Sequence, residues 1–345
     1  MTQHIGLVLV GFGNVGRALA RLLMRKRGEL ENQFGITFQV NGIATGRHGM
    51  SINPEGIFLP RALELMEHGE SLNGLSTLPV PESMPEFITA CPGDVLFENS
   101  PVNHQTGQPA ASYLKMALEK GMHAITANKG PVVHAHRELT ELAGRVGKRF
   151  LFESAVMDGA PIFSLFRGPL PAVELRSFTG ILNSCTNLLI GLMEEGRDFN
   201  DAVSYAQSIG IAETDPSADI DGWDAAIKVS ALCTVLMGVP LKPQQVQRRG
   251  IREISPAMIA EARASGQRWK LVCKAQRTGE DTVSASVQPQ RVGPETALYA
   301  INGTSSYVQF ELDVLPGLGI VESNPGPDTT AYGLLADLIN ACRGG

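Results

Sequence analysis

A run of five carboxylates ahead of a single lysine is the stretch of the chain best equipped for chemistry. The lysine is Lys228, and the carboxylates are Glu213, Asp215, Asp219, Asp221 and Asp224. Because like charges this close repel one another, the cluster is suited to holding a positive group. The pattern predicts that Asp221 caps a helix on which Asp224 and Lys228, four residues apart, share a face. A lysine between carboxylates and apolar surface has a tunable pKa, which suits proton transfer.

The alternative for this cluster is a solvated acidic loop beside an ordinary ion pair on a helix surface. Such a pair contributes only about 0.3–0.5 kcal/mol, and taken alone this interpretation is favoured. The rest of the chain decides between the two.

The first residues carry a glycine motif typical of dinucleotide binding. An apolar run, Ile5–Val10, predicts a buried strand, and a helical pattern follows the motif Gly11-Phe12-Gly13-Asn14-Val15-Gly16. Gly11 permits a tight turn, Gly13 lets the backbone approach a pyrophosphate, and Gly16 lets helix and strand pack closely. A glycine-rich turn without a ligand is the alternative, and the strand–turn–helix context makes it the weaker one.

The second predicted strand, 37–44, bears on the choice of cofactor. Enzymes that use NAD usually place an acidic residue at the end of this strand, where it binds the ribose hydroxyls. Here the strand runs into Thr45-Gly46-Arg47-His48 instead. Arg47 is suited to a 2′-phosphate, so the sequence favours NADP over NAD. An ordinary exposed arginine in a loop carries about equal weight.

Two further strands place polar residues at the same edge of the predicted sheet. The strand 94–98 runs into an exit loop, and the strand 123–127 ends at Asn128 and Lys129. Strands that alternate with helices predict a parallel, doubly wound sheet with ligands at the carboxyl ends of its strands. Lys129 lies at such an end.

The second half of the chain changes in character after Pro240. Helices are predicted before it, while strand-like runs dominate after it, at 269–275, 282–287, 297–301 and 307–313. These runs predict a mixed or antiparallel sheet with helices on one face. The other face requires a cover, and a second copy of the chain is one way to provide it, so we expect a homodimer. A final apolar-striped helix, 332–342, is expected to dock on the nucleotide-binding domain.

Length and composition indicate two domains and exclude several classes of partner. With 345 residues, the chain is expected to form a Rossmann-type α/β domain and an α+β substrate domain. The predicted ranges are 1–150 with 326–345, and 151–325. A net charge of −6 argues against nucleic acids and anionic membranes as partners. The run 5–10 is too short to span a membrane, and five scattered cysteines suit a reducing compartment, so we expect a cytoplasmic protein.

Three segments resemble homoserine dehydrogenases, and the likeness spans nearly the whole chain. They are the glycine motif 11–16, the segment Thr126-Ala127-Asn128-Lys129-Gly130-Pro131, and the pattern from Gly210-Ile211-Ala212-Glu213 through Asp224 and Lys228. The resemblance implies reversible oxidation of L-homoserine to L-aspartate 4-semialdehyde with NAD or NADP. Longer members of the family carry a regulatory domain, and with 345 residues we expect this chain to represent the short form without it.

The resemblance also implies roles for individual residues. Lys228 corresponds to the catalytic lysine, and Lys129 to one beside the substrate and the nicotinamide. Glu213 and Asp224 bind the amino-acid substrate or orient the lysine, and Asp219 lines the same pocket. The remaining positions touch the cofactor (Ser100 and Gly326) or hold a monovalent cation, Na⁺ or K⁺ (Glu153, Val156, Asp158 and Ala160).

The chain departs from the family's pattern in the substrate half. Met157 and Asp158 stand in a turn that is usually small and glycine-rich, and Cys185 stands where threonine or serine is common. These departures motivate one rival function, a dehydrogenase of the same mechanism acting on a different hydroxy amino acid. A second rival is a non-catalytic nucleotide-binding sensor, which the presence of both lysines disfavours.

Overall fold

The computed structural model describes residues 2–343 of the chain, which divides into two units. The first unit comprises residues 1–161 together with 326–345. Its sheet has the strand order β3-β2-β1-β4-β5-β6. The strands are β1 (Gln3–Val10), β2 (Ile36–Ala44), β3 (Met50–Ile52), β4 (Val95–Glu98), β5 (His123–Thr126) and β6 (Phe150–Leu151). Neighbouring strands are parallel except for β2 and β3. The order reverses between β1 and β4, which is where a doubly wound sheet binds its ligand.

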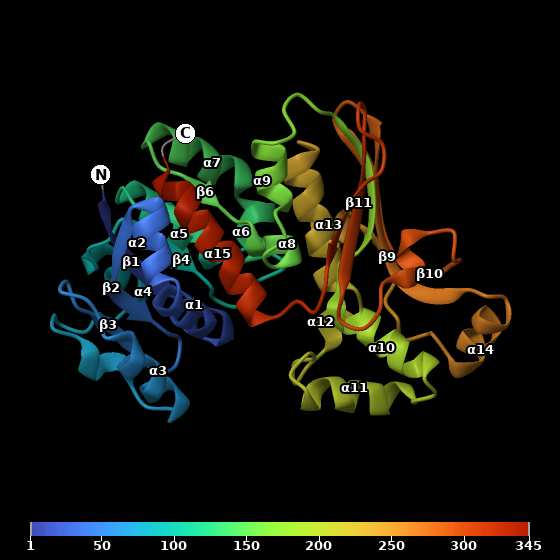
Figure 1. Cartoon of the computed structure of the whole chain (residues 1–345), viewed down its shortest axis with the longest axis horizontal. Coiled ribbons are helices and arrows are strands. Elements are labelled where there is room, and N and C mark those ends of the chain that lie inside the picture. The colour runs from blue at the N-terminus through green and yellow to red at the C-terminus, as the bar shows by residue number, and fades with distance from the viewer. Residues whose placement is uncertain (1, 344–345) are drawn as a thin grey trace. The chain divides into compact units, whose positions relative to one another are not determined.

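Helices surround this sheet (Figure 1). They are α1 (Asn14–Arg25), α2 (Arg27–Phe34), α3 (Leu59–Glu67), η1 (Leu72–Leu75), α4 (Met84–Ala90), α5 (Ala110–Glu119), α6 (Lys129–His134), α7 (His136–Arg145), α8 (Ser154–Met157) and α15 (Pro327–Cys342). In α1 the buried side chains include Leu19, Leu22 and Leu23, while Arg21 and Arg25 are exposed, as the helical spacing of the apolar residues predicts.

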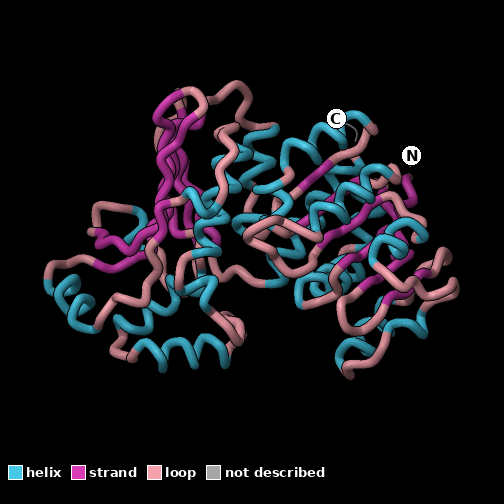
Figure 2. The backbone as a smooth tube through the Cα atoms, turned by 180° about the vertical axis from the view of Figure 1, so that it is seen from behind, coloured by secondary structure: helices cyan, strands magenta, loops and turns pink. Residues whose placement is uncertain are grey.

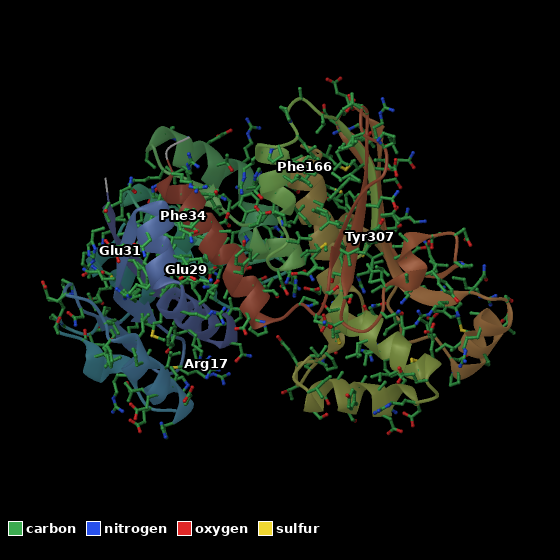
Figure 3. All side chains as sticks on the ribbon, in the orientation of Figure 1. Arg17, Glu29, Glu31, Phe34, Phe166 and Tyr307 are labelled. Atoms are coloured by element: carbon green, nitrogen blue, oxygen red, sulfur yellow. The ribbon has the colours of Figure 1, made fainter. Side chains whose placement is uncertain are left out.

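The last helix, α15, belongs to the first unit and packs on α1. Leu334, Leu335 and Leu338 share a buried cluster with Leu19 and Leu23 of α1. The helix begins at Pro327, five residues before the predicted start at Tyr332, because proline suits the first turn of a helix. Just after the helix, the Arg343 guanidinium lies 4.7 Å from the centre of the ring of Phe34 on α2, a residue labelled in Figure 3.

The second unit, residues 162–325, is built on a mixed sheet of order β12-β11-β7-β9-β10-β8. The strands are β7 (Leu175–Ile181), β8 (Gln247–Arg248), β9 (Arg268–Gly279), β10 (Thr282–Val292), β11 (Ser306–Leu312) and β12 (Leu318–Glu322). Its helices are α9 (Ile162–Arg167), α10 (Ser184–Glu194), α11 (Phe199–Ser208), α12 (Ser217–Ile220), α13 (Trp223–Leu236), η2 (Pro243–Gln245), α14 (Pro256–Ala264) and η3 (Ala297–Ala300). The expected α/β class with a second, mixed sheet is confirmed.

One face of the second sheet is covered by helices (Figures 1 and 2). Helix α13 packs against β9 and β10, and α10 against β9. From α9, the ring of Phe166 meets Phe310 of β11 edge-on, with the ring centres 5.2 Å apart (Figure 3). The buried side chains of β7 and β9, such as Phe178 and Ala275, point to this same face because their positions pair across the strands.

On the other face of the sheet, one predicted strand is absent. The segment 297–301, predicted to be a strand, forms the single 3-10 turn η3 and a following extended residue. Leu298 and Ile301 lie over the sheet in a small buried cluster with Val272 and Tyr307. The apolar residues of this segment therefore cover part of the sheet instead of extending it. The short strands β8 and β12 were not predicted.

Among residues 2–343, no helix is long and apolar enough to cross a membrane.

Candidate functional site

The glycine turn after β1 leaves room for a ligand at one position only. Gly11 has a φ of +89°, and a β-carbon on it would lie 2.5 Å from the Asn99 carbonyl oxygen. A β-carbon on Gly16 would lie 2.4 Å from the Gly11 carbonyl oxygen. A β-carbon on Gly13 would meet no described atom within 4 Å. The fold thus requires Gly11 and Gly16, whereas Gly13 opens a path to the backbone.

Helix α1 starts directly after this turn. Its N-cap, Gly13, has no side chain, and Asn14 and Val15 are its first residues. The first amide groups of a helix have no partner inside the helix, and they carry the positive end of its dipole. The turn and helix together therefore suit the pyrophosphate of a dinucleotide.

A buried carboxyl organises the ends of β4 and β5. Glu98 is fully buried; its carboxyl accepts hydrogen bonds from the Ser100 amide (2.8 Å) and the Thr126 hydroxyl (3.0 Å). Burial raises the pKa of the Glu98 carboxyl above its usual value. The Thr126 hydroxyl also accepts from the Asn128 amide, and the Asn128 side chain donates to the Ser100 carbonyl. The two strand ends are thereby locked together.

This network places Lys129 at the carboxyl edge of the sheet. The Asn128 side chain caps α6 by accepting from the Gly130 amide at 2.9 Å, so Lys129 becomes the first residue of that helix. Beside it, Asn99 and Ser100 have buried polar side-chain atoms with no hydrogen-bond partner within residues 2–343. Buried polar atoms are normally satisfied. A dinucleotide bound at the glycine turn would supply such partners, so the residues present fit that cofactor.

The loop after β2 carries no acidic residue. The Thr45 hydroxyl accepts from the His48 amide (2.7 Å) and donates to the Gly49 carbonyl (3.0 Å), which closes a tight loop. Arg47 is exposed at the tip of this loop. This loop therefore provides no carboxylate that could bind the ribose hydroxyls of a dinucleotide.

The turn predicted to hold a cation lies between β6 and α9. Glu153 is buried at the start of α8, and its amide donates to the carboxylate of Asp337 on α15 at 2.7 Å. Asp158 has a φ of +40°, a region that favours glycine, and its carboxylate accepts from the hydroxyls of Thr329 and Thr330. These two bonds hold an aspartate in a backbone conformation that a glycine would adopt without strain. The carboxylate of Asp158 therefore faces α15.

Val156 and Ala160 complete this turn, and both side chains are buried. Within residues 2–343, no group of three or more His, Cys, Asp and Glu side chains is arranged to hold a metal. The cation site expected from the sequence is not a cluster of this type, because its ligands would be one carboxylate and several backbone carbonyls.

Gly326 is the N-cap of α15. Its amide donates to the Thr329 hydroxyl at 2.8 Å, and its carbonyl accepts from the Thr330 amide at 3.0 Å. Its backbone is extended, with a φ of −178°, and a β-carbon would meet no described atom within 4 Å. Packing within the chain therefore does not require glycine here.

In the second unit, Lys228 is held in place from two sides. Its Nζ donates to the Leu182 carbonyl at 2.7 Å and lies 3.2 Å from the carboxylate of Asp224, one turn earlier on α13. The two side chains are only 13% and 15% exposed. An ion pair this buried is screened far less than one on the surface, so the interpretation as an ordinary solvated pair does not apply.

An asparagine joins Asp224 to Asp219. The side-chain amide of Asn183 donates to Asp219 at 2.6 Å and to Asp224 at 2.9 Å. Asn183 is buried between β7 and α10, where its oxygen also caps the helix by accepting from the Thr186 amide. Burial, and next the Asp219 carboxylate, raise the pKa of the Cys185 thiol, so this thiol lies beside the carboxylates in its protonated form.

The other three carboxylates take different places. The prediction that Asp221 caps α13 is wrong: the N-cap is Gly222 with a φ of +79°, and the Asp221 carboxylate pairs with Arg252. Asp215 is exposed and accepts from the Ser217 hydroxyl. Glu213 lies on the exposed loop before α12, where its carbonyl accepts from the Gln207 side chain at 3.1 Å.

Sequence reasoning missed two polar residues that organise these sites, Glu98 and Asn183. Glu98 is the last residue of β4, and Asn183 lies two residues after β7, as Asn128 lies two residues after β5. Polar residues at strand ends were the signal already used for Lys129, so the same argument would have found them.

Two family models match most of the chain. Residues 161–339 match the model "Homoserine dehydrogenase", and residues 11–153 match "Homoserine dehydrogenase, NAD binding domain". The NAD(+)-dependent homoserine dehydrogenase of Pseudomonas canavaninivorans is 34% identical over 343 residues, covering 99% of this chain and 96% of that protein. The homoserine dehydrogenase of Methanocaldococcus jannaschii is 32% identical over 335 residues, covering 97% of each.

Solved structures agree with these matches. A putative homoserine dehydrogenase from Archaeoglobus fulgidus aligns with a TM-score of 0.86 at 30% identity, covering 99% of this chain and all of that one. A hyperthermophilic archaeal homoserine dehydrogenase in complex with NADPH aligns with a TM-score of 0.81 at 29% identity, covering 98% of each chain. Together with the dinucleotide-binding turn and the buried lysine–carboxylate pair, these matches show that the chain belongs to the homoserine dehydrogenase family of NAD(P)-dependent oxidoreductases.

Proposed function

We propose that this enzyme interconverts L-homoserine and L-aspartate 4-semialdehyde, with Lys228 carrying the proton of the alcohol. The observation that supports this role is the position of the Lys228 amine, buried between the Leu182 carbonyl and the Asp224 carboxylate. Oxidation of an alcohol removes a hydride and a proton. Nicotinamide, when bound, supplies the hydride acceptor. Lys228 as a neutral amine accepts the proton, and as an ammonium it donates the proton in the reverse direction.

The carboxylates serve the substrate's own ammonium group. Asp219 and Asp224 share the amide of Asn183, so their oxygens converge. We assign the substrate ammonium to this pair and to Glu213, because a cation offsets the repulsion between acids. Lys129, at the edge of the nucleotide-binding sheet, is assigned to the contact with substrate and nicotinamide.

The motivation for a different hydroxy amino acid is weakened by the surroundings of two departures. Met157 is 2% exposed, and the Asp158 carboxylate accepts two hydroxyl hydrogen bonds from α15. Neither side chain is therefore presented as a substrate contact. Cys185 alone lies beside the carboxylates that we assign to the substrate.

Replacement of Lys228 tests the proposed proton transfer. We expect Lys228→Ala to lower kcat for homoserine oxidation by about 10²–10⁴-fold, the contribution typical of a general base. The dissociation constant for NAD(P)H should stay near that of the parent enzyme. Lys242→Ala, an exposed lysine of the same unit, is the control and should keep full activity. Unchanged turnover in Lys228→Ala would refute the role.

We favour NADP as the preferred cofactor. The exposed Arg47 and the lack of an acidic side chain in the loop after β2 support a contact with a 2′-phosphate. The relative solved with NADPH and the relative named as NAD(+)-dependent represent the two options.

We also propose a monovalent cation, Na⁺ or K⁺, held by the Glu153 carboxylate and the carbonyls of Val156, Asp158 and Ala160. Burial of the Glu153 side chain and the positive φ of Asp158 support a turn in which several oxygens converge. Activity in buffers of tetramethylammonium with added NaCl or KCl tests this. Equal rates without either metal would contradict the proposal.

We infer a homodimer formed through the face of the second sheet that helices leave uncovered.

The five cysteines are all free thiols, which supports a reducing compartment such as the cytoplasm.

A further inference from the structure

The turn between α12 and α13 sets the distance between two carboxylates of the site. Asp219 belongs to α12 and Asp224 to α13, and both must reach the single amide of Asn183. Between them lie Ile220, Asp221, Gly222 and Trp223, and Gly222 has a φ of +79°. A small rotation in this turn would move Asp224 relative to Asp219, and Lys228 with it.

A second segment, 247–252, binds this turn through its backbone and its side chains. The Ile251 amide donates to the Ile220 carbonyl at 2.9 Å. Arg248 donates to the Asp221 carbonyl, and Arg252 donates two N–H groups to the Asp221 carboxylate. The fork of a guanidinium matches a carboxylate at both oxygens, which fixes orientation as well as distance.

Close packing reinforces these hydrogen bonds. A β-carbon on Gly250 would lie 2.2 Å from the Ile220 carbonyl oxygen and 2.6 Å from the Asp221 Cα, so the two backbones are in direct contact. The Arg248 guanidinium stacks on the ring of Trp223, the first residue of α13, at 3.7 Å from the ring centre. The segment therefore contacts the turn from its last residue in α12 to the first of α13.

The segment is itself fixed to the sheet that carries Asn183. Strand β8 pairs with β10 in parallel, with Gln247 opposite Ser286 and Arg248 opposite Val287. The Arg249 amide then donates to the Val287 carbonyl at 2.8 Å. Asn183 follows β7 of the same sheet. The turn with its carboxylates and the side-chain amide of Asn183 are thus both anchored to the second sheet.

We propose that Arg248 and Arg252, which we call the arginine clamp, are positioning residues for the reaction. They hold the turn at the spacing at which Asp219 and Asp224 both reach Asn183, and they thereby fix the position of Lys228, which follows Asp224 on the same helix. This inference rests on the proposed function of those residues. The clamp acts through Asp221, whose carboxylate pairs with Arg252 and whose carbonyl accepts from Arg248.

Because Arg252 and Asp221 are exposed, an effect of this pair on turnover can be measured separately from an effect on the stability of the fold. The side chains of Arg252 and Asp221 are 54% and 33% exposed, and such ion pairs contribute little to folding. Displacement of a reacting group by a fraction of an ångström, in contrast, slows chemistry strongly. Loss of the clamp should therefore affect turnover of the amino-acid substrate and leave the melting temperature nearly unchanged.

The test compares Arg252→Gln and Arg248→Met with a matched control in the same segment. Arg249→Gln is that control, because the Arg249 guanidinium pairs with Glu253. We expect the two clamp variants to lose about tenfold in kcat/KM for homoserine, with NAD(P)H affinity near the parent value. The Tm of Arg252→Gln should stay near the parent value, because that side chain is exposed. Arg249→Gln should keep the parent kcat/KM. Arg252→Lys, which keeps the charge without the fork, should recover part of the loss.

A double-mutant cycle shows whether the clamp acts through Asp221. The variant that combines Arg252→Gln with Asp221→Asn should be no slower than the worse single variant. Full activity of Arg252→Gln, additive losses in the cycle, or a parallel loss of cofactor affinity and Tm in Arg252→Gln would overturn the clamp. If Lys228→Ala is inactive while the arginine variants are unimpaired, the clamp alone fails. A fully active Lys228→Ala instead overturns the proposed function.

Discussion

At the scale of single residues, Arg47 offers a direct test of cofactor preference. A guanidinium that meets a 2′-phosphate makes a charge-assisted hydrogen bond, worth about 1.5–3 kcal/mol. We therefore expect Arg47→Ala to weaken NADPH binding about tenfold or more, while the dissociation constant for NADH changes by less than about twofold. Fluorescence titration with each cofactor measures both. Arg61→Ala removes another exposed arginine of the same unit and serves as control. Equal losses for the two cofactors would refute the phosphate contact.

Glu98 makes the stability of the nucleotide-binding unit depend on pH. Because burial raises the pKa of this carboxyl in the folded chain, the folded state holds a proton that the unfolded chain releases. The contribution is fully present below the unfolded value of about 4.5 and is lost as pH rises through the raised folded value. A glutamine keeps the acceptor for Ser100 and adds a donor toward Thr126.

Glu98→Gln should therefore show a smaller fall in the free energy of unfolding between about pH 5 and about pH 8 than the parent enzyme. Urea unfolding at several pH values measures this slope. Glu119→Gln, an exposed carboxyl on α5, is the control and should follow the parent curve. A parent-like slope in Glu98→Gln would show that Glu98 is ionised throughout this range.

At the scale of elements, the turn from β1 to α1 contains one glycine that packing requires, Gly16, and one that we assign to ligand binding, Gly13. A methyl group on Gly16 would overlap the Gly11 carbonyl oxygen, whereas one on Gly13 would meet open space. We expect Gly16→Ala to destabilise the enzyme by about 1–3 kcal/mol, as overpacking does. Gly13→Ala should keep the parent Tm and bind NAD(P)H about tenfold more weakly, because its methyl group occupies the approach of the pyrophosphate. Thermal unfolding and cofactor titration of both variants decide the matter. Parent-like affinity in Gly13→Ala would show that the pyrophosphate does not approach this position.

Elements with a strong periodic pattern could be predicted from the sequence, and those defined by distant contacts could not. The lysine helix α13 and the strands β1, β2 and β11 lie where their patterns placed them, to within a residue or two. The segment 297–301 has the apolar content of a strand, but its side chains cover the sheet. Strand β8 has only two residues and exists because it pairs with β10. A local pattern carries no information about such a partner.

The same limit applies to the candidate site. Asp224 and Lys228 could be paired from the sequence because they are one helical turn apart. Asn183 lies 41 residues from Asp224, and Arg252 lies 31 residues from Asp221. The mistaken helix cap at Asp221 has the same origin, since its carboxylate binds a distant arginine in preference to the neighbouring amides. Contacts of this kind are set by the fold as a whole.

At the scale of the whole molecule, we expect the polar face of the second sheet to meet a second copy of the chain. Along β7, β9 and β11, the side chains that point away from the helices include Thr179, Lys274 and Gln309, which lie opposite one another on adjacent strands. They are exposed or half-buried. Twofold symmetry would place this face against its own copy, and a stable interface buries roughly 1,600 Å² in total.

We expect a solution mass of twice the chain's 36.9 kDa, measured by light scattering coupled to size exclusion. Thr179→Glu should weaken the dimer by about tenfold or more, because the symmetry doubles every added charge within the interface. The fold accommodates this change, since Lys274 lies opposite Thr179 on β9 and can pair with the new carboxylate. Asn200→Glu adds the same charge on the exposed helix α11 and should leave the dimer intact. A monomer at micromolar concentration, or a dimer as tight in Thr179→Glu as in the parent enzyme, would contradict a subunit contact through this face.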